Sequence, residues 1–231
     1  AVQEFGAKAI AEAARDAGAT LTHISAIGAE AGSPTGYGRT KGRAEAAIHS
    51  VLPGAVILRP SIIFGPEDDF FNKFAKMARG LPFLPLIGGG KTKFQPVYVE
   101  DVAEAVARSV DGKLKPGAIY ELGGQDVMTF RDCLEAVLAA TYRQRPFVDL
   151  PFGIASMIAK ITSMIPLITP PLTVDQVTML KKDNVVSADA EKNGLTLEGI
   201  GITPVRVASV LPSYMVQYRT HGQFSNAGKA A

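Results

Sequence analysis

The sequence predicts an α/β protein in which helices cover both faces of a parallel sheet. Helical and strand patterns alternate over the first 65 residues, and both predicted strands are near-continuous apolar runs. Strands of that composition are typical of parallel sheets buried on both faces. The 231 residues are enough for one substantial domain, or for a domain with a small lobe.

The first four elements are predicted from the spacing of apolar residues and from the residues that end each pattern. Apolar residues recur at helical spacing from Val2 to Ala14, and Gly18 stands where a left-handed C-terminal cap is expected. Residues 20–28 then read as a buried strand and residues 35–52 as a second helix. A second buried strand, rich in β-branched residues, is predicted over 55–65.

The remaining elements alternate less regularly. Helices are predicted over 68–81, 100–112 and 127–142, strands over 118–124 and 145–151, and a Pro- and Gly-rich passage with a short strand near its end over 82–99. Asp101, with Glu104 three positions later, is interpreted as the N-cap of the helix at 100–112. Thr129 is predicted to cap the next helix.

Charge and cysteine content exclude several classes of protein. The net charge is +2 with both signs interspersed, so no nucleic-acid partner is expected. The single cysteine, Cys133, cannot form an internal disulfide and is interpreted as a buried structural thiol in a reducing compartment. His23, His49 and His221 lack partners at metal-ligand spacing, so no metal site is predicted.

An apolar stripe between Ile154 and Ile165 allows two interpretations. Its apolar residues recur at helical spacing with a single charge, Lys160, but it is too short to span a bilayer. Packing against the protein's own core is the first interpretation, and docking on a partner or a membrane surface is the second.

Tyr37 and Lys41 stand four positions apart at the start of a predicted helix, twelve positions after Ser25 at the end of a predicted strand. A Tyr-x-x-x-Lys match arises by chance in roughly a third of sequences of this composition. Its context is more specific, because all three groups can meet at the carboxyl edge of a parallel sheet. There a lysine ammonium would lower the pKa of the phenol, and the serine would hold a reacting oxygen beside it. The alternative is a tyrosine packed on the sheet and a lysine in solvent.

Several motifs together resemble a known family. HISAIGA, YGRTK, LRPSIIFGPED, KFQPVYVEDVA and LTVDQVTMLKKDNVV resemble the extended and atypical short-chain dehydrogenase/reductases. FGPEDDFFNKFA, QPVYVEDVA and DQVTMLKKDN are similar to one branch, which contains the NAD(P)H-binding accessory subunit of respiratory complex I and its bacterial relatives.

The resemblance implies NAD or NADP as the cofactor and a role for each matching residue. Tyr37 would be the general acid or base, Lys41 would also bind the nicotinamide ribose, and Ser25 would be the serine of the preceding strand. The Arg-Pro-Ser-hydrophobic run implies that four further residues lie along the nicotinamide: Pro60, Ser61, Ile62 and Ile63.

One feature of the family is missing. Its glycine-rich turn, which binds the pyrophosphate at a helix N-terminus, has no counterpart in these 231 residues. Gly90-Lys91-Thr92 is not a substitute, because Pro85 stands where a phosphate-binding loop needs its first glycine. We therefore expect the chain to be a fragment of a longer protein, inactive in isolation. The residue that selects NAD or NADP would lie upstream.

The predicted fold is the C-terminal part of a Rossmann-type doubly wound sheet with a small α+β lobe. Residues 1–65 would form the remaining dinucleotide-binding part, 66–220 a substrate or interaction lobe interleaved with the sheet, and 221–231 a frayed tail.

The resemblance implies an NAD(P)-dependent oxidoreductase or epimerase-like protein linked to NADH:quinone oxidoreductase or quinone metabolism. The alternative is a non-catalytic NAD(P)H-binding assembly subunit. Expected partners are the dinucleotide and, through residues 154–165, quinone, complex I subunits or a membrane surface. The expected location is cytoplasmic, peripheral on the cytoplasmic face of the inner membrane.

Overall fold

The computed structural model describes residues 2–163 and 173–220. The chain divides into two compact units. One comprises Ala1–Ser61, Val97–Gln125 and Asn184–Pro204, and the other comprises Ile62–Pro96, Asp126–Asp183 and Val205–Ala231. The predicted frayed tail and the last two residues of the apolar stripe, Met164 and Ile165, lie outside the described residues.

The first unit holds a parallel sheet of three strands in the order β1-β2-β7. These strands span Thr22–Ile24, Val56–Pro60 and Ile119–Leu122. Ile57 of β2 pairs with His23 on one side and Ile119 on the other, so β2 is the central strand. Its apolar run is buried on both faces, which confirms the predicted class of sheet.

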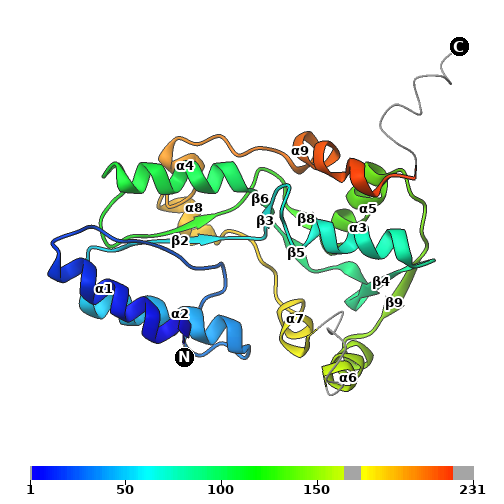
Figure 1. Cartoon of the computed structure of the whole chain (residues 1–231), viewed down its shortest axis with the longest axis horizontal. Helices are drawn as coiled ribbons and strands as arrows, with labels where there is room; N and C mark the ends of the chain where they lie inside the picture. The colour runs from blue at the N-terminus through cyan, green and yellow to red at the C-terminus, as the bar shows by residue number, and fades with distance from the viewer. Residues whose placement is uncertain (1, 164–172, 221–231) are drawn as a thin grey trace, which may run out of the picture. The chain divides into compact units, whose positions relative to one another are not determined.

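Helices cover both faces of this sheet (Figure 1). α1 (Ala7–Asp16) and α2 (Gly36–Val51) lie on one face and α4 (Val99–Val110) on the other. Fully buried Ala11, Ile48 and Ala55 form the apolar contact between α1, α2 and the start of β2. The arrangement is the layered parallel sheet expected from alternating helix and strand patterns.

Predicted helix ends agree with the structure at two positions and differ at one. Gly18 has φ +64°, the left-handed conformation expected after α1. Thr129 caps α5 (Phe130–Thr141) in a reciprocal capping box with Asp132. Asp101 as the cap of α4 is wrong, because that helix begins at Val99 and Asp101 lies inside its first turn. Glu104 accepts a hydrogen bond from Arg108 Nε instead, at 2.8 Å.

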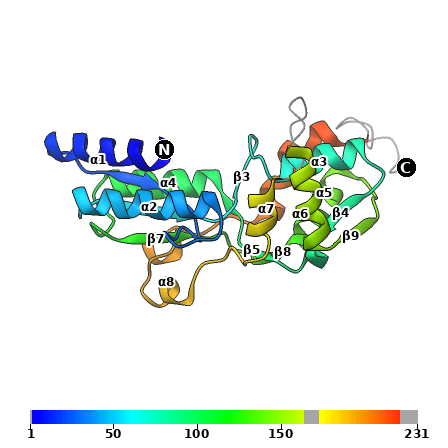
Figure 2. The ribbon, with the colours of Figure 1, turned by 90° about the horizontal axis from the view of Figure 1, so that it is seen from below.

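The second unit combines helices with two small sheets (Figure 2). α3 (Phe71–Gly80) packs against α5. β4 (Leu84–Ile87) pairs in parallel with β9 (Phe147–Leu150), and β5 (Lys93–Phe94) pairs antiparallel with β8 (Met128–Thr129). Phe70, Phe74, Phe94 and Phe130 pack with ring centroids 5.2–6.4 Å apart, mostly edge to face, and form an aromatic core.

The remaining described elements are short, apart from α6. They are η1 (Val2–Gly6), β3 (Ile63–Phe64), η2 (Gly88–Gly90), β6 (Val97–Tyr98), α6 (Phe152–Ser163), α7 (Val174–Met179), α8 (Ala188–Lys192), η3 (Glu198–Ile200), α9 (Val207–Tyr214) and η4 (Met215–Tyr218). Within residues 2–163 and 173–220, no helix combines the length and the apolar character needed to cross a bilayer.

Candidate functional site

The first turn of α2 is fixed by a polar loop before it. Thr35 is the N-cap, and its hydroxyl accepts from the Gly38 amide at 3.1 Å. Arg39 Nη1 donates to the carbonyl oxygens of Ser33 and Pro34, both at 2.9 Å. Tyr37, predicted to transfer the proton, therefore stands on a well-anchored first turn.

Two glycines bring the loop after β1 against the helix. A Cβ at Gly38 would lie 2.4 Å from Ser33 Oγ, and a Cβ at Gly42 would lie 2.4 Å from the backbone carbonyl carbon of Glu30. The Glu30 amide donates to the Gly38 carbonyl at 3.2 Å. Positions 38 and 42 share one helix face, so the loop can approach α2 only because neither residue has a side chain.

Lys41 reaches the carboxyl end of β1. Its Nζ donates to the Ile24 carbonyl oxygen at 3.0 Å, next to Ser25. Partial burial lowers the pKa of Lys41, while the charge of Glu45 raises it. The strand, the helix and their spacing thus bring the lysine amine to the strand end predicted from the sequence.

Ser25 presents a buried hydroxyl at this strand end. The residue is 3% exposed, and its amide donates to the Leu58 carbonyl at 2.7 Å, which holds it beside β2. Its hydroxyl has no hydrogen-bond partner among the described residues. A buried polar group without a partner carries a desolvation cost, which a ligand at this edge would relieve.

The surroundings of Tyr37 change the pKa of its phenol. Its side chain is partly exposed, and partial burial raises the pKa of its phenol above the ordinary value of 10.0. The Lys41 ammonium donates to the Ile24 carbonyl in this structure, and the predicted lowering of the Tyr37 pKa by Lys41 stays a prediction.

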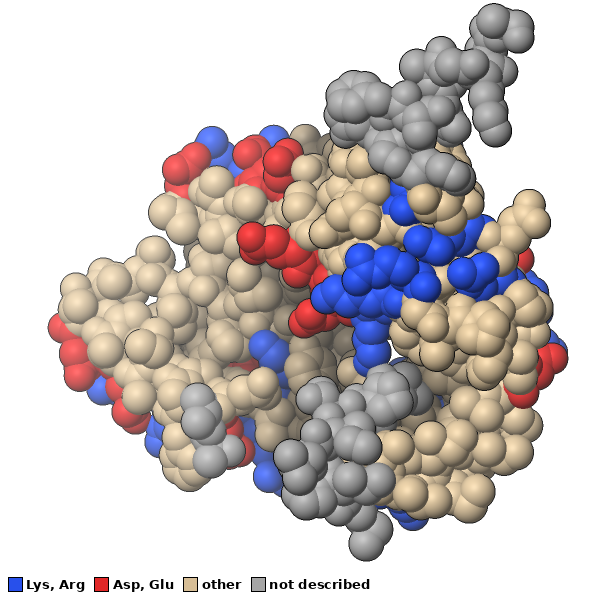
Figure 3. All heavy atoms as spheres, turned by 45° about the vertical axis from the view of Figure 1, so that its right-hand side comes forward, with Lys and Arg blue, Asp and Glu red and all other residues tan. Residues whose placement is uncertain are grey.

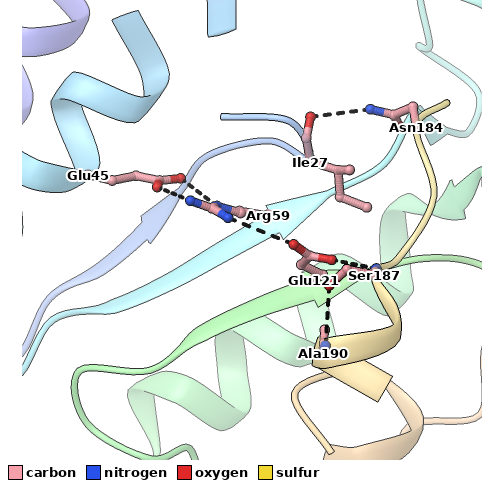
Figure 4. Close-up of polar contacts among 7 residues, drawn as sticks. All are labelled: Ile27, Glu45, Arg59, Glu121, Asn184, Ser187 and Ala190. Atoms are coloured by element: carbon pink, nitrogen blue, oxygen red, sulfur yellow. Dashed lines mark hydrogen bonds and ion pairs between the residues drawn. The ribbon is translucent and has the colours of Figure 1, made fainter. Parts of the chain in front are cut away.

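The Pro60–Ile63 run is divided between the two units. Pro60 ends β2, and the Ser61 hydroxyl donates to Asn184 Oδ1 at 2.6 Å. Asn184 Nδ2 in turn donates to the Ile27 carbonyl at 3.3 Å (Figure 4). Ser61 therefore joins the strand end to the loop after β1. Ile62 and Ile63 belong to the second unit, so their predicted place along a nicotinamide stays a prediction.

A buried ionic network supports the site and was not predicted from the sequence. Arg59 in β2 makes two hydrogen bonds to Glu45 of α2, at 2.9 and 2.5 Å, and lies 3.8 Å from Glu121 of β7. Glu121 accepts from the Ser187 amide at 2.7 Å, ahead of α8 (Figure 4). One feature of the sequence could have indicated this network. Arg59 is an arginine in an otherwise apolar strand, and a buried arginine needs a carboxylate partner.

Other sequence features have structural roles. Gly88–Gly90 forms a turn before strand β5, not a loop before a helix, so it cannot bind phosphate as a P-loop does. Cys133 is fully buried, and burial raises its thiol pKa to about 12, as expected of a structural thiol. His49 Nε2 lies 3.1 Å from the Ala55 carbonyl oxygen, and His221 is outside the described residues. The described residues contain no metal-ligating cluster.

The structure also tests the stripe at 154–165. Within α6, the small residues Ala155 and Ala159 are buried, whereas Ile154, Met157, Ile158 and Ile161 are 40–55% exposed. Packing of these large side chains into the protein's own core is therefore wrong for the part of the stripe that the structure describes. An exposed apolar face of this kind favours the docking interpretation.

Comparison with known proteins assigns the family. Residues 1–154 match the model of the RmlD substrate binding domain. The chain belongs to this family. A solved dTDP-4-dehydrorhamnose reductase from Bacillus anthracis, in complex with NADP, has a similar fold over part of the chain (TM-score 0.55, 15% identity, 64% of this chain and 57% of that one).

Similar relatives include subunits of mitochondrial NADH dehydrogenase. The chain is 35% identical over 222 residues to NADH dehydrogenase (ubiquinone) 1 alpha subcomplex subunit 9 of Arabidopsis thaliana, covering 94% of the chain and 55% of that protein. It is 28% identical over 220 residues to the NADH-ubiquinone oxidoreductase 40 kDa subunit of Neurospora crassa, covering 95% and 56%. The chain thus spans just over half the length of these relatives, and the matches confirm the resemblance read from its motifs.

A solved epimerase has the same fold over most of the chain. UDP-glucuronic acid 4-epimerase from Bacillus cereus, in complex with UDP-glucuronic acid and NAD, aligns with a TM-score of 0.66 and 18% identity. The alignment covers 93% of this chain and 67% of that one. At this identity the likeness concerns the fold alone, and it confirms a Rossmann-type α/β architecture.

Proposed function

We propose that this chain carries the proton-transfer side of a site in an NAD(P)-linked, epimerase- or reductase-like protein associated with NADH:quinone oxidoreductase. The carrying observation is at the carboxyl end of β1, where the buried Ser25 hydroxyl has no partner among the described residues and the Lys41 amine donates to the carbonyl of the preceding residue, Ile24. Ligands of doubly wound folds bind at that end of the sheet. The names of the relatives support the link to the respiratory enzyme.

The residues present fit a nicotinamide dinucleotide with a carbonyl or alcohol substrate. The dinucleotide would supply or accept the hydride. Ser25 would donate to the reacting oxygen, and Tyr37 would give that oxygen a proton or take one from it. Lys41 would exchange its bond to the Ile24 carbonyl for the ribose and the phenolate, which would lower the pKa of Tyr37.

A non-catalytic subunit that holds the dinucleotide is the second candidate. It is favoured by the raised pKa of Tyr37, because a phenol that stays protonated is a poor base at neutral pH. The same residues can bind a cofactor without turning it over.

Turnover by the full-length protein separates the two candidates. If the protein is an enzyme, we expect Tyr37→Phe to lower kcat about 10²- to 10⁴-fold and to change the Kd for the dinucleotide less than about twofold. The assay would follow NADH and NADPH absorbance with carbonyl and sugar-nucleotide substrates. If the wild type binds the cofactor, gains thermal stability from it and shows no turnover, the protein is the binding subunit.

We further propose a peripheral location at the cytoplasmic face of the inner membrane. The relatives are named as subunits of a respiratory enzyme, and α6 offers exposed apolar side chains for contact with neighbouring subunits.

A further inference from the structure

The second unit contains a pocket with aromatic walls. Its cavity volume is about 250 Å³. Four rings line it, Phe70, Phe74, Phe94 and Phe130, and Ile62, Met179 and Leu180 complete the apolar wall. We call this cavity the phenylalanine pocket. Nearly all of its surface is hydrocarbon, so it suits an apolar body and offers few partners for the hydroxyls of a sugar.

A second, polar pocket shares residues with the first. It measures about 290 Å³ and shares Asp69, Lys73 and Gln176 with the phenylalanine pocket. Its remaining lining is Asp68, Asn72 and Lys76. The two cavities thus meet at Lys73, and together they match a molecule that has an apolar part and a polar part.

The polar pocket is lined by two carboxylates, Asp68 and Asp69, and by two amines, Lys73 and Lys76, which can donate to an anionic head group. Asp68 is already bonded, since it accepts from the Tyr214 hydroxyl at 2.7 Å and from the Asn72 amide at 3.1 Å. Lys73 and Lys76 stand on one face of α3, and no hydrogen bond or ion pair within 4.0 Å occupies either amine among the described residues. Figure 3 shows lysine and arginine side chains gathered next to acidic ones on the face that it displays.

An anionic ligand would also stabilise the charge of Lys73. Partial burial lowers its pKa, and the charge of Asp69 raises it. The ammonium is therefore incompletely hydrated at the mouth of an apolar cavity, where an anion would compensate it.

We propose that the second unit binds a free single-chain anionic amphiphile, with its chain in the phenylalanine pocket and its head group at Lys73 and Lys76. The site lies wholly within one unit and does not depend on the proposed dinucleotide site.

Calorimetric titration of the full chain with octanoate, decanoate and dodecanoate, below their micelle concentrations, tests the ligand class. We expect the affinity to rise about fifteenfold for each two carbons until the pocket is filled. Decyltrimethylammonium should bind at least tenfold more weakly than decanoate because its head group cannot accept hydrogen bonds from the Lys73 and Lys76 amines. Equal binding of the two amphiphiles, or no gain with chain length, would overturn the proposal.

Matched variants test where the amphiphile binds. Met179 lines the pocket and is 39% exposed, whereas Met157 on α6 is 55% exposed and outside it. We expect Met179→Glu and Lys73→Gln each to weaken decanoate binding about tenfold or more, with Lys73→Arg restoring it, and Met157→Glu to have no effect. Unfolding curves check that each variant is folded.

An effect of Met157→Glu as large as that of Met179→Glu would place binding on the exposed face of α6 and contradict the proposal. The last measurement compares binding to phosphatidylserine vesicles with binding of free decanoate. Binding to the vesicles that decanoate does not displace, without binding of free decanoate, would show a membrane surface as the partner and would also contradict it.

Discussion

At the scale of single residues, the candidate site is described by the hydrogen-bond partners and the pKa of three polar side chains. Ser25 has a buried hydroxyl without a hydrogen-bond partner in the part of the chain that the structure describes, and the Lys41 amine donates to the Ile24 carbonyl. Tyr37 has a phenol whose pKa is raised by burial. In the proposed function Ser25 would donate to a ligand oxygen, and Lys41 would leave the Ile24 carbonyl so that Tyr37 could act as a base.

His23 gives a pH prediction at this scale. Burial lowers its pKa below the ordinary value of 6.5, the Lys41 charge lowers it further, and Glu45 opposes both. The unfolded chain therefore binds the proton at higher pH than the folded one, so this stability is present above about pH 6.5 and is lost as the pH falls through the lower folded pKa.

We therefore expect the free energy of unfolding of the wild type to fall more steeply between about pH 7 and about pH 5 than that of His23→Gln, which cannot titrate there. Urea unfolding at a series of pH values measures the difference. Parallel pH profiles for the two proteins would show that the imidazole is equally easy to protonate in both states.

At the scale of elements, much of the fold could be predicted and the failures have physical causes. Continuous apolar runs predicted β1 and β2. The central strand β2 is buried, as expected of a strand covered on both faces, whereas the predicted burial of β1 is wrong, because its residues are only partly buried and Ile24 is 43% exposed. The start of α4 was misplaced because Asp101 fits a cap pattern, although β6 leads into the helix directly at Tyr98. Local patterns do not show where a preceding strand ends.

The sequence also could not show which face of α6 is buried. Packing of its large apolar side chains into the core was the first of two interpretations, but the buried residues of this helix are Ala155 and Ala159. The same holds for the phenylalanine pocket, whose wall joins Ile62, Phe94, Phe130 and Met179 from distant parts of the chain. Periodicity identifies apolar faces, and only the tertiary fold decides which of them meet.

The exposed face of α6 gives a prediction for this element. Because Met157 and Ile161 are 55% and 54% exposed, we expect their joint replacement by lysine to change the free energy of unfolding by no more than about 1 kcal/mol. Attachment to the membrane fraction or to the respiratory enzyme should be lost, as sedimentation would show. Ala159→Lys is the matched control, since Ala159 is fully buried and its replacement should unfold the protein.

Unfolding of the double variant at Met157 and Ile161 would instead show that this face packs into the protein's own core. Retained attachment with an unchanged fold would remove α6 as the docking element.

At the scale of the whole molecule, the chain combines part of a doubly wound sheet with a lobe that has its own aromatic core. The proposed proton-transfer residues all come from the first unit, whereas the phenylalanine pocket lies in the second. The spacing of Ser25, Tyr37 and Lys41 predicts that they meet, because it follows from strand and helix geometry. The structure brings the Lys41 amine to the end of β1, and the meeting with Tyr37 stays a prediction. Arg59 in an apolar strand indicates that a carboxylate partner exists, but the sequence could not show that Glu45 and Glu121 provide it, because the three residues lie on separate elements.

The most direct test of the account is the Kd of the full-length protein for NADH and NADPH, measured by fluorescence titration with Lys41→Met. Loss of a charged hydrogen-bond donor should weaken binding about 10- to 150-fold. Lys8→Met is the control, because Lys8 pairs with Glu12 at 3.6 Å on the exposed side of α1. Weakening by Lys41→Met alone is the result we expect, and an unchanged Kd in a folded Lys41→Met variant would contradict a dinucleotide site at the carboxyl end of β1.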